Sequence, residues 1–93
     1  MTNINNISSH ILNKLLNSKA FSILKLSRNN LKPSYGSFSV HFGDSDILSF
    51  SAYSDPKYNV DYYKFGVLSI IYSGTDLDLA YESLETKLLC EAL

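Results

Sequence analysis

The sequence predicts an α+β fold in which a three- to four-stranded antiparallel sheet is flanked by an N-terminal and a C-terminal helix. Three observations predict this fold. Apolar residues recur at helical spacing near both ends of the chain, they alternate with serine in the middle, and Gly, Asp and Pro separate the alternating segments. The expected order is helix, three or four strands, helix, with one face of the sheet covered by the helices and the other exposed.

The length and composition of the chain are those of one small globular domain. The chain has 93 residues, of which 45% are hydrophobic and 18% charged, and this size leaves no room for a second core. No apolar run is long enough to span a bilayer, and the N-terminus lacks the basic and apolar stretches of a signal peptide. We therefore expect a single domain over residues 1–93, without a membrane segment, in the cytoplasm.

The first helix is predicted from Asn5 to Asn17, because its apolar residues fall on one face at 100° per residue. Asparagine and serine residues at its start can cap it. After Ser18 the apolar residues scatter around the helical wheel. We therefore expect residues 20–27 to form a strand, and a longer helix reaching Arg28 is the alternative.

Strict alternation in residues 37–42 and 47–54 predicts a β-hairpin, with "GDSD" as its turn. One face of this hairpin is apolar and the other is rich in serine. Residues 28–36, which contain Pro33 and Gly36, are expected to be a loop. The residues expected to face the core are Phe38, Val40, Phe42, Leu48, Phe50 and Ala52.

The aromatic segment 58–73 is predicted to be one long strand that bends at Gly66. The alternation changes parity there, and a β-bulge would reset the facing. Two short strands are the alternative. The last helix follows Thr75, whose spacing to Asp78 resembles a capping box, and its apolar stripe is centred on Leu84 and Leu88.

Catalytic, cofactor and metal signatures are missing from the sequence. His10 and His41 have no nucleophile motif beside them, and the Asp44–Asp46 pair belongs to a turn. The single cysteine, Cys90, is expected to be a buried filler on the last helix. We predict no catalytic, cofactor-binding or metal-binding residues, and therefore a protein that is not an enzyme.

Charge is divided unevenly along the chain. Residues 44–93 contain all nine acids and only three lysines, whereas residues 1–43 contain no acid. This division has two interpretations: the two halves complement each other in the fold, or the basic half binds nucleic acid. The basic residues of the first half are Lys14, Lys19, Lys25, Arg28 and Lys32.

The stretch "KYNVDYYKFG" places aromatic rings on both faces of a strand, because Tyr58 and Tyr62 have opposite parity to Tyr63 and Phe65. We predict that Tyr58 and Tyr62 lie on the outer face. Exposed tyrosines stack on bases or anchor protein interfaces, and the acids around this stretch favour a protein partner. The predicted partner-binding residues are Tyr35, Tyr53, Tyr58, Asp61, Tyr62, Glu82 and Glu85.

These features together predict a non-enzymatic binding protein that blocks or regulates another macromolecule. The plan is similar in size and architecture to small phage- and plasmid-encoded inhibitors, including some anti-CRISPR proteins and bacteriocin immunity proteins. The frequent Asn, Ile, Lys and Tyr indicate AT-rich coding, which is common in mobile elements. The partner expected is a protein, such as a nucleic-acid-binding complex, and the chain itself a monomer or homodimer. The alternative is a nucleic-acid-binding regulator that uses its basic N-terminal half.

Overall fold

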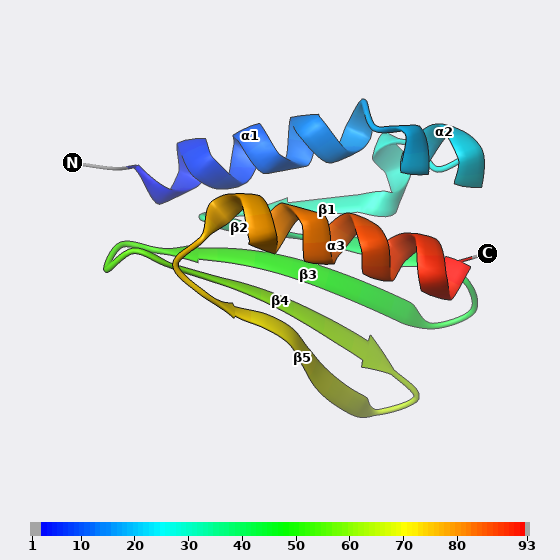
Figure 1. The fold of residues 1–93 in the computed structure, drawn as a ribbon. Coiled ribbons are helices and arrows are strands. Elements are labelled where there is room, and N and C mark those ends of the chain that lie inside the picture. The colour runs from blue at the N-terminus through cyan, green and yellow to red at the C-terminus, as the bar shows by residue number, and fades with distance from the viewer. Residues whose placement is uncertain (1–2, 93) are drawn as a thin grey trace.

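A computed structural model describes residues 3–92 (Figure 1). Five strands form one antiparallel sheet in the order β1-β2-β3-β4-β5. Helix α1 packs over β2 and β3, and α3 packs over β3, β4 and β5 on the same face. The predicted α+β fold is confirmed, with five strands where three or four were expected. The elements are α1 (Ile4–Leu16), α2 (Lys19–Leu24), the 3-10 helix η1 (Arg28–Asn30), β1 (Leu31–Ser34), β2 (Ser37–Phe42), β3 (Asp46–Tyr53), β4 (Lys57–Lys64), β5 (Val67–Gly74) and α3 (Leu77–Ala92).

The first helix forms nearly as predicted. The side chain of Asn3 caps the helix start by accepting hydrogen bonds from the backbone N–H groups of Asn5 and Asn6. The buried face of α1 carries Ile11 and Leu15 against the sheet.

The predicted strand at residues 20–27 is wrong, because a second helix, α2, forms over Lys19–Leu24. The Ser18 side chain caps it by accepting from the N–H of Phe21, and Lys25 ends it with a left-handed φ of 57°. This helix has only six residues and buries Ala20 and Phe21 alone. It is too short to show an apolar stripe. The alternative of one helix reaching Arg28 is also wrong, because α1 ends at Leu16 and α2 ends at Leu24.

The predicted β2–β3 hairpin is confirmed, and all six residues expected to face the core are buried. The loop expected over residues 28–36 is only partly a loop, because it contains η1 and the short edge strand β1. Leu31 of β1 lies opposite Val40 of β2 and is buried with it. Its single buried residue explains why alternation did not reveal this strand.

The long bent strand predicted over residues 58–73 is wrong, and the alternative of two strands is confirmed. Phe65 and Gly66 have φ of 52° and 79°, and they form the two-residue turn between β4 and β5. A register irregularity lies deeper in the ladder, where Val60 faces Tyr72 but Asp61 faces Ile70, which leaves Ile71 as an extra residue.

Helix α3 forms as predicted. The carboxylate of Asp76 accepts a hydrogen bond from the N–H of Leu79, so Asp76 caps the helix in place of the expected Thr75. Leu84 and Leu88 are fully buried against the sheet. Within residues 3–92, no helix combines the length and apolar character needed to cross a membrane.

Candidate protein-binding surface

Tyr58 and Tyr62 are core residues, so the prediction that they lie on the outer face is wrong. Their exposed fractions are 7% and 6%, and they share the covered face of β4 with Val60. The Tyr58 ring stacks on Phe50 with centroids 6.3 Å apart. Val60, which is fully buried, has the same parity as Tyr58 and Tyr62. This aliphatic residue between the two tyrosines was the signal in the sequence that could have assigned their face correctly.

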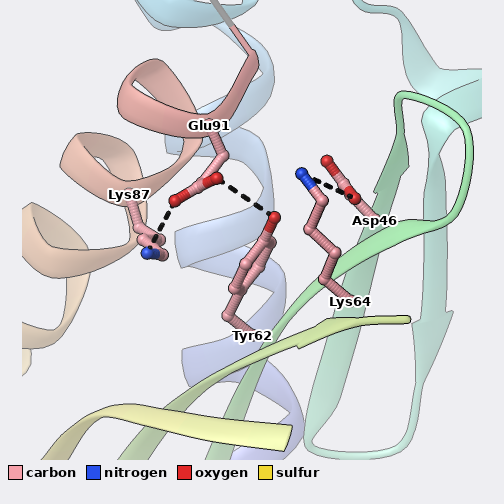
Figure 2. Close-up of polar contacts among 5 residues, drawn as sticks. All are labelled: Asp46, Tyr62, Lys64, Lys87 and Glu91. Carbon is pink, nitrogen blue, oxygen red and sulfur yellow. Dashed lines mark hydrogen bonds and ion pairs between the residues drawn. The ribbon is translucent and has the colours of Figure 1, made fainter. Parts of the chain in front are cut away.

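A polar cluster connects the hydroxyl of Tyr62 to the last turn of α3 (Figure 2). The hydroxyl donates to Glu91 Oε2 over 3.3 Å, and Lys87 Nζ lies 2.8 Å from Glu91 Oε1. Burial raises the pKa of Tyr62 to about 12, and the charges of Asp46 and Glu91 act in the same direction. Lys64 pairs with Asp46 at 3.8 Å beside this cluster. The Tyr62–Glu91 bond joins β4 to α3 and the Lys64–Asp46 pair joins β4 to β3, so the cluster has a structural role.

The Glu91 contacts predict a pH-dependent contribution to stability. The hydrogen bond from Lys87 holds the pKa of Glu91 below its usual 4.5, so its stabilising effect is present above pH 4.5 and is lost as pH falls through the lowered pKa. We expect Glu91→Gln to lower the melting temperature slightly at pH 7 and to lower it less at about pH 3. Thermal melts followed by circular dichroism at both pH values test this. An equal difference at both values would contradict the linkage.

The predicted acidic residues do not form one surface. Glu85 accepts a hydrogen bond of 2.8 Å from the hydroxyl of Tyr81, and burial together with this bond raises the pKa of Tyr81. Glu82 is exposed on α3, in the helical layer. Asp61 lies on the open face of the sheet, which is the face that the helices do not cover. It sits between Ser49 and Ile70, where partial burial raises its pKa. Glu85 therefore has an intramolecular role, and only Asp61 shares a face with other predicted residues.

Tyr35 and Tyr53 are exposed, as predicted, with exposed fractions of 73% and 46%. Both lie at the end of the sheet where β1 turns into β2, because the neighbouring residues Gly36 and Ala52 are hydrogen-bonded. Tyr53 belongs to the open face. The structure thus keeps these two tyrosines as surface candidates, whereas Tyr58, which faces Ala52 across the β3–β4 ladder, and Tyr62 are buried on the covered face.

An apolar surface that sequence reasoning missed surrounds the β4–β5 turn. We call it the hairpin patch, and it consists of Tyr63, Phe65, Val67, Leu68 and Ile70, with exposed fractions between 41% and 76%. At about 200 Å² for a large side chain, these residues together expose on the order of 600 Å², which is divided between the two faces of the hairpin. The uncharged run from Phe65 to Ile71 was the signal for it in the sequence.

The hairpin patch lies partly on the open face. Tyr63 faces Leu68 across the β4–β5 ladder, and both point away from the helices with Ile70. A hollow of about 450 Å³ adjoins Tyr63, lined by the β2–β3 turn and by Ile47, His41 and Leu26, among others. The apolar end of the open face therefore has both a raised hairpin and a depression beside it.

The part of the open face that belongs to β2 is polar. Ser39 Oγ lies 3.1 Å from His41 Nε2, and in residues 3–92 no carboxylate is hydrogen-bonded to that histidine. Within the same described residues, no group of three His, Cys, Asp or Glu side chains is placed to hold a metal ion. Cys90 is exposed, so its prediction as a buried filler is wrong. The outward side of α3, on which Cys90 lies, is not covered by the sheet.

The two edges of the sheet differ in chemistry. β1 is four residues long and contains Lys32 and Pro33, both of which discourage pairing with another strand. β5 is eight residues long and contains no charged residue and no proline. Its first four residues, Val67–Ile70, are all exposed. The β5 edge is therefore open to pairing in a way that the β1 edge is not.

Comparisons of the chain with protein-family models, with curated proteins and with solved structures find no match.

Proposed function

We propose that this protein binds another protein through the hairpin patch and thereby blocks or regulates it, without catalysis. The hairpin patch is the observation that supports the proposal. Five large apolar side chains within eight residues are exposed to water, and three of them, Tyr63, Leu68 and Ile70, share the open face of the sheet. Exposed apolar residues gathered in this way on a small domain are typical of a protein interface.

The surroundings of the patch have the composition of an interface rim. Ser49 and Asp61 border it on the open face, and Tyr53 lies farther along the same face. The hollow beside Tyr63 is suited to receive an anchoring side chain of the partner. We propose an inhibitory role like that of small phage- and plasmid-encoded inhibitors, in which the bound partner loses access to its own ligand, and we expect the protein to act in the cytoplasm.

Photo-crosslinking tests the proposed interface. A photoreactive amino acid replaces Leu68 in one variant and Ile23 in a control, and both variants are expressed in cells of the source organism. Leu68 and Ile23 are similarly exposed, at 62% and 60%, but Ile23 lies on α2. We expect position 68 to crosslink to a protein other than this chain, and position 23 to give no such crosslink. Ile70→Lys should then weaken binding of that identified protein about tenfold or more.

Two outcomes would contradict the proposal. One is that position 68 captures no other protein in such cells, and the second is that both positions capture the same set of proteins. The Ile70→Lys variant should keep its melting temperature, because the Ile70 side chain is 70% exposed.

A second candidate function is nucleic-acid binding, and one observation favours it. The two ion pairs within residues 3–92, Lys64–Asp46 and Lys87–Glu91, both join residues of the acidic half. The five basic residues of the first half are exposed and lie outside these pairs, so ion pairs between the halves do not form in the described part of the chain. Gel shifts at low and high salt test this function, since phosphate contacts predict binding that weakens steeply with salt.

A further inference from the structure

We propose that two copies of this chain pair through antiparallel β5 edges, so that their hairpin patches merge into one surface. The proposal rests on the proposed function, because the merged surface is the one that would hold the partner protein. In this arrangement the binding surface of a single chain is half of the complete one.

The β4–β5 turn determines which backbone groups of β5 point outward. In a hairpin with a two-residue loop, the flanking residues, here Lys64 and Val67, form a hydrogen-bonded pair. Hydrogen-bonded and non-bonded pairs alternate along an antiparallel ladder, so Ser69 also bonds to β4, opposite Tyr62. The N–H and C=O groups of Leu68 and Ile70 therefore point away from the sheet. They are the free hydrogen-bonding groups of the edge.

These outward groups select one register for a symmetric pair. A two-fold axis perpendicular to the sheet and passing beside Ser69 places Leu68 of one copy opposite Ile70 of the second copy, and the reverse. Each such pair exchanges two hydrogen bonds, so all outward groups of the regular segment find partners. An axis beside Leu68 would place Ile70 opposite Gly66 in the turn. An axis beside Ile70 would place Leu68 opposite Tyr72, beyond the irregularity at Ile71.

The side chains are compatible with this register. No charged residue occurs from Val67 to Gly74, so like charges do not meet across the pair. Residues opposite each other in an antiparallel ladder point to the same face. The open faces of both copies are therefore continuous, and Tyr63, Leu68 and Ile70 of the two chains form one apolar surface at the centre of a ten-stranded sheet.

The area available indicates how strong the dimer should be. Complete burial of both hairpin patches would remove on the order of 1,200 Å² in total, the lower limit for specific interfaces. Edge pairing covers only the flanks of these side chains. We therefore expect a dimer with micromolar affinity, whose open face stays free for a larger partner.

Sedimentation equilibrium from low to high micromolar concentration tests the dimer. The parent chain should shift from 10.4 kDa toward twice that mass. Ile70→Lys should weaken self-association about tenfold, because it removes the contacts of Ile70 with Leu68 of the second copy and symmetry places two lysines beside the shared edge. The matched control Ile23→Lys changes an exposed isoleucine on α2 and should associate like the parent. Leu68→Lys is a second variant in case Ile70→Lys does not fold.

Disulfide trapping tests the register. In a Cys90→Ser background, Ser69→Cys should form an intermolecular disulfide, because self-paired residues of an antiparallel ladder lie about 4.5–5.5 Å apart at Cα, within disulfide reach. Ser73→Cys lies in the same strand, away from the axis, and should stay reduced. A parent chain that is monomeric at every concentration overturns the proposal, as does equal trapping of both cysteine variants.

The outcomes separate this proposal from the proposed function. A monomeric chain that still crosslinks another protein through position 68 overturns the dimer and leaves the binding function in place. A dimer trapped through Ser69→Cys, without any captured protein of another kind, supports the dimer and overturns the proposed regulation of another protein.

Discussion

Replacing Leu84 with alanine should cost about 2–5 kcal/mol of unfolding free energy. Leu84 is fully buried at the centre of the α3 stripe, where the helix covers β3, β4 and β5. Truncation removes apolar contacts and leaves a cavity, and a small domain has little stability to spare. Leu88, which is equally buried, should behave in the same way. Chemical denaturation followed by circular dichroism measures the loss.

Leu79→Ala is the control for this experiment, because Leu79 lies on the same helix with 49% of its surface exposed. Its unfolding midpoint should stay close to that of the parent chain. If Leu84→Ala and Leu79→Ala had equal midpoints, α3 would be peripheral to the core.

Replacing Tyr62 with serine should cost about 3 kcal/mol or more, a core-truncation effect rather than a loss of binding alone. The Tyr62 ring is buried and stacks on Phe42, with centroids 6.4 Å apart. Lys87 Nζ covers the ring at 4.7 Å from its centroid. Removing the ring opens the contact between β4 and α3. The unfolding free energy of this variant, measured in urea, checks the prediction.

Tyr62→Phe separates the ring from the hydroxyl. It keeps the stacking and loses only the hydrogen bond to Glu91, so its stability should fall by no more than about 1 kcal/mol. A folded Tyr62→Ser variant with the stability of the parent would contradict the core role of Tyr62 and would support its prediction as an interface residue.

The contrast between the two sheet edges links the fold to the proposed function. An edge strand that lacks charge and proline is a hazard for a protein that must stay monomeric, and the β1 edge carries Lys32 and Pro33. The β5 edge carries neither. The same hairpin presents Leu68 and Ile70 on the open face, so strand pairing and partner binding would use different sides of one element.

Local patterns in the sequence determined the terminal helices and the β2–β3 hairpin. The alternation of Phe38 with serines and the helical spacing of Leu84 and Leu88 each match one period over a whole element, and burial on one face produces that period. The sequence also determined the uneven division of charge and the lack of a familiar catalytic motif.

Tertiary structure decided two kinds of element. One buries too few residues to show a period, and in the other the choice of buried face depends on a neighbouring element. Helix α2 buries only Ala20 and Phe21, so no stripe in residues 20–27 could distinguish it from a strand. The turn at Phe65 and Gly66 reverses the chain, which places Tyr63 and Leu68 on one face although their parities differ. Parity assigns faces only within one strand, and the position of α3 over β4 then decided which face of that strand became the core. For this reason the sequence revealed a cluster of tyrosines, whereas packing buried Tyr58 and Tyr62 and left the hairpin patch exposed.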